Sequence, residues 1–394
     1  MIDTIFFAAV LLAALYWVAA FACVARYARR RPAPSRRSPP VTILKPLCGD
    51  DGQLYENLAA FCRQEYPTFE ILFGVRDHDD AAVGVVERLI HEFPGVELKL
   101  VVDDRTVGTN LKVSNLANLV RHATHDTLII ADADMRVRAD YIATVAGAVE
   151  DRDIGLVTCL YRGVAGARLS SRLGAMFINE WLVPSALVGT WIEELRHAFG
   201  ATIACRRDTL QAIGGFEAVA SHLADDYMLG RLVHRLGLRV VLVPYLVDNM
   251  IADTRLSDLV VHELRWARTF RTLRPLSYFC SLFTFGIPVS LAWLAVSLGS
   301  PLASAAVLAH IALRCGGRMV LSQAVGREVR GRDAWLVPIR DVLSFVIGVA
   351  SFLGRTVRWN DSELYVHPDG RLERLPHANA GTRPSVASKW EEQA

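Results

Sequence analysis

Apolar and polar positions alternate along the first part of the chain in a strand-and-helix pattern. Four short apolar runs have the length and composition of buried strands: residues 41–46, 69–75, 96–102 and 126–134. Helical stretches separate the first run from the second and the second from the third, around 53–64 and 81–92. This alternation predicts an α/β domain with a parallel, doubly wound sheet. Such sheets bind ligands at the carboxyl ends of their strands.

The chain opens with an apolar segment that is long enough to cross a bilayer. Residues 5–25 carry no charge, and six arginines follow between positions 26 and 37. This order predicts an uncleaved transmembrane anchor over 1–25 and a basic juxtamembrane linker over 26–40. A cleaved signal peptide would instead carry its positive charge before a shorter apolar core. Positively charged segments beside a membrane span tend to stay in the cytoplasm, so we expect the chain after the anchor to face the cytoplasm.

The last third of the chain becomes apolar again and predicts a C-terminal membrane region over 276–356 with two or three spans. Residues 276–298 have the length of one span, whereas 301–313 need an extension toward residue 321 or form a re-entrant segment. A further span over 335–352 requires that Arg340 and Asp341 are tolerated, as a pair facing protein. A polar tail follows over 357–394.

Composition excludes several classes of function. The 394 residues are 52% hydrophobic with a formal net charge of +2, so no basic face for nucleic acid is indicated. None of the seven cysteines pairs at C-x-x-C spacing, which indicates neither a zinc site nor a disulfide framework. A reducing cytosol suits the part outside the bilayer.

Acidic side chains follow two of the predicted strands at their carboxyl ends. The sequence RDHDD at 76–80 follows the second strand, and DAD at 132–134 follows TLII. Asp132 and Asp134 offer hard oxygen ligands for Mg²⁺ or Mn²⁺, and such an ion binds a diphosphate. An Asp-x-Asp pair is also common in ordinary turns, so its place after a buried strand is what favours a metal site.

A third acidic pair opens a predicted helix. Residues 229–236 repeat apolar positions at helical spacing, Gly237 follows as a stop signal, and Asp225 and Asp226 precede them. Carboxylates in a first turn ordinarily cap free N–H groups. A metal-bound diphosphate implies sugar transfer from a nucleotide sugar, and an inverting transfer also needs a base for the proton of the acceptor. We expect Asp226 to be that base and Asp225 to cap or tune it.

Basic and aromatic side chains further along supply candidate contacts for the donor. In HELRWARTF at 262–270, Arg265 can bind a diphosphate and Trp266 can stack on a sugar. The alternative is a basic juxtamembrane helix whose arginines face lipid headgroups. We prefer that interpretation for Arg268, Arg271 and Arg274.

Other polar residues have two interpretations. Lys112 and Asn115 in NLKVSN contact donor phosphate or sugar, or they are a helix-start lysine and a cap. His197 is a candidate for the acceptor site, although a lone histidine near an apolar stretch is more often structural. That stretch, 173–192, is broken by polar residues and a proline, which predicts a helix in the membrane interface or one that lines an acceptor groove.

From about residue 41 to about 275, the chain resembles the GT-A type glycosyltransferases of the ceramide glucosyltransferase family. The matching segments are LKPL at 44–47, RDHDDAA at 76–82, VGTNLKVSNL at 107–116, DAD at 132–134, ADDY at 224–227 and HELRW at 262–266. The resemblance implies a Rossmann-like GT-A domain over 41–275 that binds a UDP-sugar with a divalent metal.

The resemblance also implies a role for each acidic site. Asp80, beside Asp77, falls near the nucleoside of the donor. Asp132 with Asp134 falls at the metal and the diphosphate, and Asp226 falls at the position of the catalytic base.

The final motif of the family is Gln- or Arg-x-x-Arg-Trp. Arg265 and Trp266 match it, whereas His262 stands where Gln or Arg is usual. This departure leaves a diphosphate contact by residue 262 unsupported.

Within the family, the chain is most similar to the bacterial hopanoid-associated branch. The segments that carry this similarity are FGVRDHDD, NLKVSN, VTCLYRG, FGATIA and HELRW. The similarity implies transfer of N-acetylglucosamine from UDP-GlcNAc to bacteriohopanetetrol by a multi-pass enzyme of the bacterial inner membrane. The alternatives are a ceramide acceptor with UDP-glucose as donor, a processive polysaccharide synthase, or a non-catalytic membrane scaffold.

Overall fold

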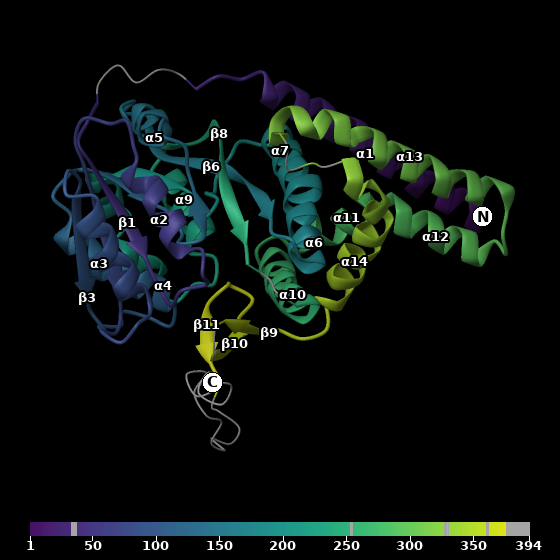
Figure 1. Cartoon of the computed structure of the whole chain (residues 1–394). Coiled ribbons are helices and arrows are strands. Elements are labelled where there is room, and N and C mark those ends of the chain that lie inside the picture. Colours follow the sequence, from purple (N-terminus) through teal and green to yellow (C-terminus); the bar gives the residue numbers. More distant parts are fainter. Residues whose placement is uncertain (33–37, 253–254, 327–328, 330, 360–361, 376–394) are drawn as a thin grey trace, which may run out of the picture.

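The computed structural model describes residues 1–32, 38–252, 255–326, 329, 331–359 and 362–375 (Figure 1). An eight-stranded sheet, in the order β3-β2-β1-β4-β7-β6-β8-β5, forms the centre of the main domain. Its strands are β1 (Val41–Pro46), β2 (Phe69–Val75), β3 (Glu97–Val102), β4 (Thr127–Ile130), β5 (Met135–Arg136), β6 (Ile154–Ala165), β7 (Ile203–Arg206) and β8 (Arg239–Ile251).

Helices cover both faces of this sheet. Ile43 and Leu44 are neighbours on β1, yet their side chains belong to different core clusters on opposite faces. Leu54, Val86 and Ile142 from α2, α3 and α5 pack on the first face, and α4 and α9 pack on the second. The helices of this domain are α2 (Leu54–Cys62), α3 (Ala82–Glu92), α4 (Leu111–Leu119), η1 (Val120–His122), α5 (Tyr141–Val149), α8 (Arg207–Ala212), η3 (Phe216–Val219) and α9 (Asp225–Arg235).

The predicted parallel order holds for only half of the sheet. Strands β1 to β4 are parallel, as the apolar runs predict. Beyond them β7 runs antiparallel to both β4 and β6, and β5 runs antiparallel to β8, so the sheet is mixed. The strands β7 and β5 have only four and two residues, too few for apolar periodicity to reveal them.

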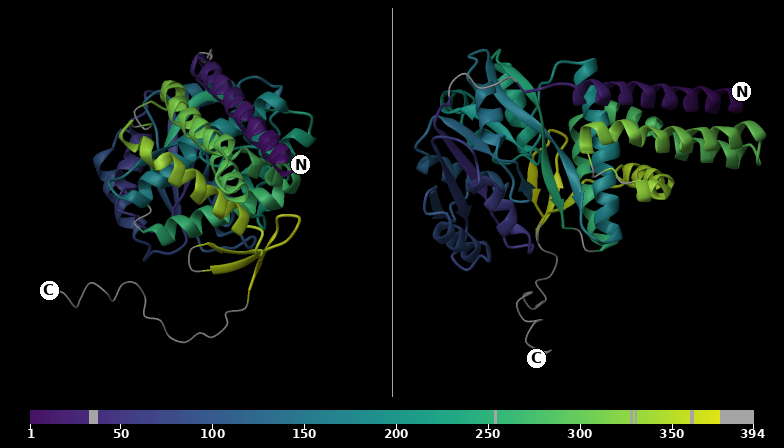
Figure 2. Two further views of the ribbon diagram at one scale, coloured as in Figure 1. Left: turned by 90° about the vertical axis from the view of Figure 1, so that its right-hand side faces the viewer. Right: turned by 45° about the horizontal axis from the view of Figure 1, so that its top comes forward.

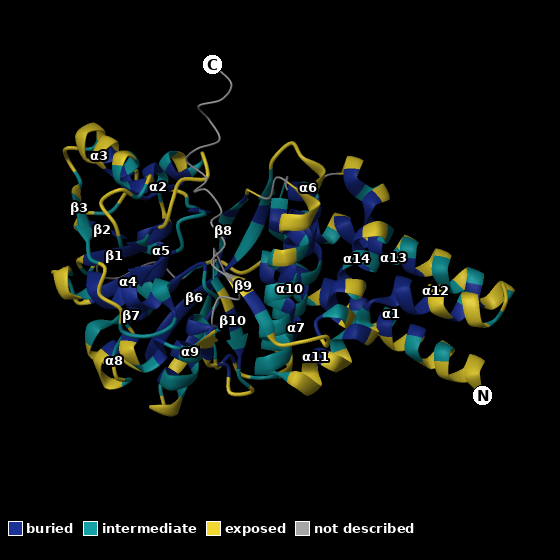
Figure 3. Ribbon diagram, turned by 90° about the horizontal axis from the view of Figure 1, so that it is seen from below, coloured by how far each residue is buried: buried dark blue, intermediate teal, exposed yellow. Residues whose placement is uncertain are grey.

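A second group of helices extends away from the sheet, with α1, α12 and α13 side by side as an arm (Figures 1 and 2). Apolar residues are exposed along this arm, among them Leu12, Leu298 and Leu308 (Figure 3). The group consists of α1 (Ile2–Ala28), α6 (Leu169–Phe177), the π-helix η2 (Ile178–Leu182), α7 (Val183–Ile192), α10 (Leu256–Leu273), α11 (Pro275–Ser281), η4 (Leu282–Thr284), α12 (Gly286–Val296), α13 (Pro301–Val325), η6 (Gly331–Leu336) and α14 (Val337–Ala350).

In the described part of the chain, α1 and α13 are long and apolar enough to cross a membrane, and a bent helix pair makes a third candidate. That pair, Pro275–Thr284 with Gly286–Val296, bends by 66°, so the span expected over 276–298 is a broken span or a re-entrant loop. The indole of Trp17 donates to the carbonyl of Thr284 at the break, 2.8 Å away, and so satisfies an acceptor that a continuous helix would have used. These helices indicate a membrane protein.

The expected pairing of Arg340 with Asp341 is wrong. Arg340 pairs with Glu263 of α10, and Asp341 pairs with Arg314 of α13. Neighbours in a helix point about 100° apart, so each side chain meets a different helix. At 14 residues, α14 is about 21 Å long and short for a span.

A separate three-stranded sheet, in the order β11-β10-β9, follows the last helix. Its strands are β9 (Thr356–Trp359), β10 (Ser362–Val366) and β11 (Leu372–Arg374). This C-terminal sheet lies between the main domain and the helices (Figure 1).

Candidate active site

A cavity of about 810 Å³ opens at the carboxyl ends of β1 and β4 and extends between α7 and α10. It brings together most of the residues that the sequence singles out. Those on its wall are Lys112, Asn115, Asp132, Asp134, His197, Asp225, Asp226, His262, Arg265 and Trp266. Asp77 and Asp80 do not line it.

Asp132 and Asp134 lie in the short connection between β4 and β5, and both face the cavity. Asp134 Oδ2 accepts a hydrogen bond from Asn249 Nδ2 at 2.8 Å. Burial raises the pKa of Asp134, and the charge of Asp132 raises it further. Two crowded carboxylates of this kind are stabilised by a cation.

These two carboxylates fit Mg²⁺ or Mn²⁺ as far as protein ligands go. No group of three or more His, Cys, Asp or Glu side chains within the described residues forms a complete metal site. Mg²⁺ in nucleotide sites is ordinarily held by one or two carboxylates together with substrate phosphates. A Cβ placed on Gly200 would lie 3.5 Å from Asp132 Oδ2 and 3.3 Å from Asp226 Oδ2, so the absence of a side chain there keeps the space beside them open.

Lys112 lies between Asp132, one of the two candidate metal ligands, and Asp225 at the start of α9. Its ammonium lies 2.6 Å from Asp132 Oδ1 and 3.6 Å from Asp225 Oδ2. Burial opposes the charge on Lys112, but Asp132 and Asp225 outweigh it and raise the pKa of the lysine. Lys112 therefore remains a cation and neutralises part of the acidic cluster. Asn110 caps α4 by accepting from Val113 N at 3.2 Å, and this cap sets the start of the helix that presents the lysine.

Asp225 and Asp226 occupy the first turn of α9, as the sequence predicts. Asp226 Oδ1 accepts from the N–H of Tyr227 at 2.7 Å, so the carboxylate also serves the helix end. Burial and the neighbouring Asp225 raise the pKa of Asp226, while Lys112 lowers it. A carboxylate with a raised pKa is a stronger base than an exposed aspartate.

Lys45 is a site residue that the sequence analysis missed. It is the penultimate residue of β1, in the LKPL segment, and its side chain is completely buried. The ammonium donates to the carbonyl of Asp132 at 2.6 Å and lies 3.8 Å from the ring centre of Phe61. Burial lowers its pKa to about 7, against the opposing charges of Asp132 and Asp134. The sequence signal that could have identified Lys45 is the presence of a lysine within an otherwise apolar strand.

The helix α10 presents Arg265 and Trp266 to the cavity. Burial lowers the pKa of Arg265, and the carboxylates of Asp132 and Asp134 oppose that change. The ring of His262 stands edge-on to Trp266, with the centroids 4.4 Å apart. A cation and an aromatic face therefore lie on the wall of the cavity that holds the two aspartates.

The three arginines that follow on this helix and at its end do not match their predicted role. Arg268 and Arg271 donate to backbone carbonyls between residues 351 and 356, and Arg274 pairs with Glu193. The preferred interpretation, that they face lipid headgroups, is corrected by these protein partners.

Three of the residues predicted to bind the sugar donor form hydrogen bonds within the protein. Asp80 Oδ1 accepts from the N–H groups of Gly49 and Ala82, both at 2.9 Å, and so fixes the loop after β1, to which Gly49 on the cavity wall belongs. Asn115 Nδ2 donates to the carbonyl of Gly74 at 2.8 Å, which ties α4 to β2. Asp77 Oδ1 accepts from the N–H of Asp79 in the same turn.

The far part of the cavity is apolar. The segment 173–192 forms α6, η2 and α7, and its residues Trp181, Leu182 and Ala186 line the cavity opposite Phe270. Trp181 stacks between Phe177 and Phe285, with centroids 5.2 and 5.5 Å away. The expectation that this segment lines a groove agrees with the structure.

His197 lies where the polar and apolar parts meet. Its ring stacks on Tyr227 at 5.1 Å and meets Phe199 edge-on. Burial lowers the pKa of His197 to about 4, and Arg274 adds to this effect. The imidazole is therefore neutral at pH 7, which suits packing and hydrogen bonding better than charge recognition.

Comparison with known proteins gives consistent matches. A family profile described as Glycosyl transferase family 21 matches residues 5–372. Ceramide glucosyltransferase 3 of Caenorhabditis elegans is 26% identical over 236 residues, which is 58% of this chain and 50% of that protein. Ceramide glucosyltransferase 1 of the same organism is 27% identical over 210 residues, 53% of this chain and 45% of that protein. The chain thus spans about half the length of these curated relatives.

A solved structure shares the fold. Mannosyltransferase PcManGT from Pyrobaculum calidifontis, in complex with GDP-Man and Mn²⁺, superposes with a TM-score of 0.59 at 18% identity. The match covers 89% of this chain and 99% of that one. It shows a mixed α/β domain of GT-A type with apolar helices at both ends.

Proposed function

The chain belongs to glycosyl transferase family 21, and on that premise we propose that it transfers a sugar from a UDP-sugar to a hydroxyl group of a membrane lipid, with inversion at the anomeric carbon. The observation that carries this proposal is that one cavity has both a polar and an apolar end. Its polar end gathers acidic and basic groups suited to a nucleotide sugar, and its apolar end runs between α7 and α10 toward the membrane helices.

Each polar residue then has a defined task. Asp226 accepts the proton of the acceptor hydroxyl, the oxygen bonds to the anomeric carbon, and the bond from that carbon to the diphosphate oxygen breaks. UDP leaves with the electron pair, and Arg265 neutralises part of its new charge. Asp132 and Asp134 would hold a Mg²⁺ or Mn²⁺ ion, which supplies further positive charge to the departing diphosphate.

Lys112 and Lys45 prepare the site. Lys112 holds Asp132 and Asp225 in place, and Lys45 fixes the backbone of Asp132. Both therefore orient carboxylates before the donor arrives, which reduces the reorganisation needed during transfer. Asp77 and Asp80 shape the loop beside the nucleoside. The arginines that follow the apolar part of α1 support a main domain on the cytoplasmic side. We propose that the membrane is the inner membrane of a bacterium.

For substrates, we propose UDP-N-acetylglucosamine and bacteriohopanetetrol. The second candidate is ceramide with UDP-glucose, and the names of the curated relatives favour it. A processive synthase needs a channel for its polymer, formed by several membrane spans. The described chain has two or three candidate spans, which favours transfer of a single sugar over a synthase.

A cross test separates these substrates. Full-length protein in detergent with Mg²⁺ or Mn²⁺ is offered each UDP-sugar with each lipid, and products are followed by mass spectrometry. We expect a single N-acetylhexosamine on bacteriohopanetetrol. A hexose on ceramide would move the protein to the sphingolipid alternative, polymer would support a synthase, and no product in any pairing would contradict the proposed acceptors.

A variant tests the base. Asp226→Asn should keep UDP binding and lose transfer by about 10²-fold or more, the usual contribution of a general base. Transfer at the wild-type rate would reject Asp226 as the base.

A further inference from the structure

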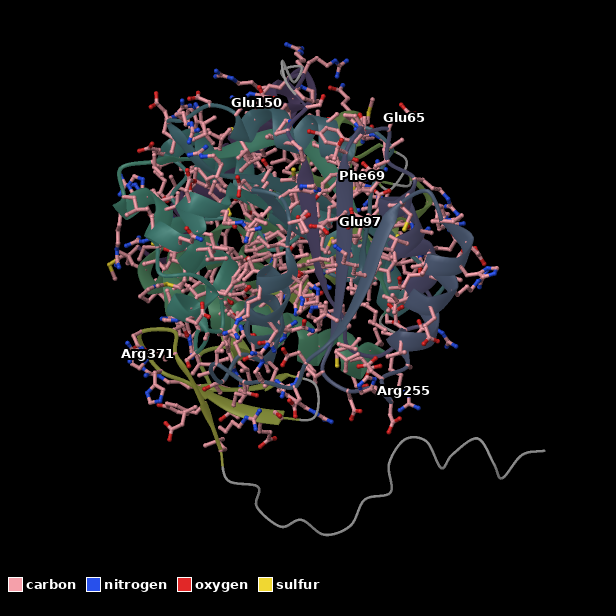
Figure 4. The ribbon with its side chains drawn as sticks, turned by 90° about the vertical axis from the view of Figure 1, so that its left-hand side faces the viewer. Glu65, Phe69, Glu97, Glu150, Arg255 and Arg371 are labelled. Carbon is pink, nitrogen blue, oxygen red and sulfur yellow. The ribbon has the colours of Figure 1, made fainter. Side chains whose placement is uncertain are left out.

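The C-terminal sheet lies where the chain should bind its substrates. It follows the membrane helices in sequence. Phe69 begins β2, and Glu65 lies near it, so both mark the amino ends of the parallel strands, and Arg371 of the C-terminal sheet lies far from them (Figure 4). Ser362, Leu364 and Arg374 of this small sheet line the cavity. The segment after the last helix is therefore part of the cavity wall.

This sheet continues its hydrogen bonding into the loop before the proposed base. The N–H of Leu372 donates to the carbonyl of Ser221 at 2.7 Å, and the N–H of Leu223 donates to the carbonyl of Gly370 at 3.0 Å. Leu223 also packs in a buried cluster with four side chains of the sheet: Val357, Leu364, Val366 and Leu372. The loop 220–224 thus behaves as a neighbour of β11.

The other side of the same loop is held by the start of α4. The N–H of Asn110 donates to the carbonyl of Ala220 at 2.8 Å, and its side-chain amide donates to the carbonyl of His222 at 2.9 Å. A Cβ on Gly108 would lie only 2.3 Å from the carbonyl oxygen of Ala220, so the two backbones are in close contact. The loop is clamped between α4 and the C-terminal sheet, and Asp225 and Asp226 follow at once.

The sheet in turn is fastened to α10. Arg268 donates to the carbonyls of Leu353 and Thr356, and Arg271 donates to those of Ser351 and Gly354. These arginines follow Arg265 on one helix, so the sheet and the proposed diphosphate contact share a support. The backbone between α14 and β9 cannot shift without losing charge-assisted hydrogen bonds.

We propose that the C-terminal sheet β9–β11 is a positioning element of the active site, which fixes the loop 220–224 and thereby the place of the Asp226 carboxylate beside the acceptor hydroxyl. The inference rests on Asp226 acting as the base. Donor binding depends on groups outside this loop, namely Asp132, Asp134 and Arg265. Loosening the loop should therefore lower turnover and spare UDP affinity.

The test replaces Leu372 in the full-length chain, which removes one hydrogen bond to the loop and one side chain of the cluster around Leu223. Leu372→Pro deletes the N–H that binds Ser221. Arg358→Pro is the matched control, because it places a proline in the edge strand β9 without removing a hydrogen bond of the sheet. The N–H of Val366 on β10 donates to the carbonyl of Arg355, so residue 355 faces β10 with its hydrogen-bonding groups. In an antiparallel ladder these groups alternate along the strand, so the N–H of Arg358 points away from β10. Calorimetry with UDP and Mn²⁺ counts the folded sites and measures affinity, and kcat is expressed per UDP site.

We expect kcat of Leu372→Pro to fall by about ten-fold to a hundred-fold, as for a misplaced catalytic group, with UDP affinity unchanged. Arg358→Pro should match the wild type in both. Equal kcat values for the two proline variants would overturn the proposal, since general weakening of the sheet would then explain everything.

A milder pair covers the case in which Leu372→Pro does not fold. Val366→Ala reduces the cluster around Leu223 and leaves the backbone intact, and Glu363→Ala changes an exposed residue of the same strand. The proposal expects a lower kcat for Val366→Ala alone, and an unchanged kcat would refute it. Asp226→Asn in the same assay keeps the two ideas apart. If Asp226→Asn turns over at the wild-type rate, the assignment of Asp226 as the base fails. If Asp226→Asn is inactive and the sheet variants turn over at the wild-type rate, the base assignment stands and only the positioning role of the sheet is refuted.

Discussion

The buried ion pair between Glu263 and Arg340 provides a quantitative test of how α10 is held in place. Arg340 donates to the two carboxylate oxygens of Glu263 at 2.9 and 2.6 Å, and also to Ser344. The side chains are only 3% and 4% exposed. Glu263→Gln removes one charge and leaves the guanidinium buried, which costs about 3–5 kcal/mol when a buried pair is broken.

An exposed pair in the same region is the matched control. Glu193 and Arg274 are 39% and 40% exposed, so Glu193→Gln should cost at most about 1 kcal/mol. Replacing both buried partners, as in Glu263→Leu with Arg340→Met, should recover most of the loss, because a well-packed apolar pair avoids the cost of a lone buried charge.

Thermal inactivation of the detergent-solubilised protein, followed by UDP binding, measures all three variants. We expect the midpoint temperature of Glu193→Gln to lie near that of the wild type. The midpoint of the double variant should equal that of Glu193→Gln or lie below it, and the midpoint of Glu263→Gln should be clearly the lowest. If Glu263→Gln and Glu193→Gln lose the same stability, the burial of the Glu263 pair does not control the attachment of α10, and the reasoning fails.

Substitutions at three further positions examine the polar end of the cavity. Lys112→Met should move the acid limb of the pH profile of kcat/KM to higher pH, because burial and Asp225 raise the pKa of Asp226 and Lys112 lowers it, and a base works only when deprotonated. Asn249→Ala removes the hydrogen bond to Asp134 and should weaken Mn²⁺-dependent UDP binding by about ten-fold in calorimetry. Gly200→Val should abolish this binding and Gly200→Ala reduce it less, because even a Cβ there comes within 3.3 Å of the Asp226 carboxylate; normal binding by the valine variant would contradict a site at this place.

The sequence predicted the parts of the fold that local patterns determine. The buried apolar runs predicted β1 to β4, and the acidic residues after them fell at the carboxyl ends of the strands because parallel strands share one edge. The helical spacing after Asp226 predicted α9, and Gly237 ends it with a φ of 80°. The C-terminal sheet lay within the predicted polar tail, because its short strands have no lasting alternation.

Partners between distant segments could not be predicted, because they depend on tertiary packing. Arg340 and Asp341 are adjacent in sequence, so they were the nearest pair to propose, but their side chains point to different helices. Arg268 and Arg271 resembled a basic helix at a membrane surface until the chain after α14 came back against them. Lys45 was hidden inside an apolar strand, and its partner is the backbone carbonyl of Asp132, which is distant in the sequence.

The charge balance of the cavity explains why its residues act as one unit. Asp132, Asp134, Asp225 and Asp226 supply four of the carboxylates that line it, and a nucleoside diphosphate would bring further negative charge to the same place. Lys112 already compensates Asp132 and Asp225. Arg265 is one more cation on this wall, and an additional positive charge beside Asp132 and Asp134 would further reduce the repulsion between the donor and the carboxylates. A divalent ion held by Asp132 and Asp134 would supply that charge. We therefore expect donor affinity to disappear on chelation of the metal, whereas the fold, which the lysine already stabilises, should persist.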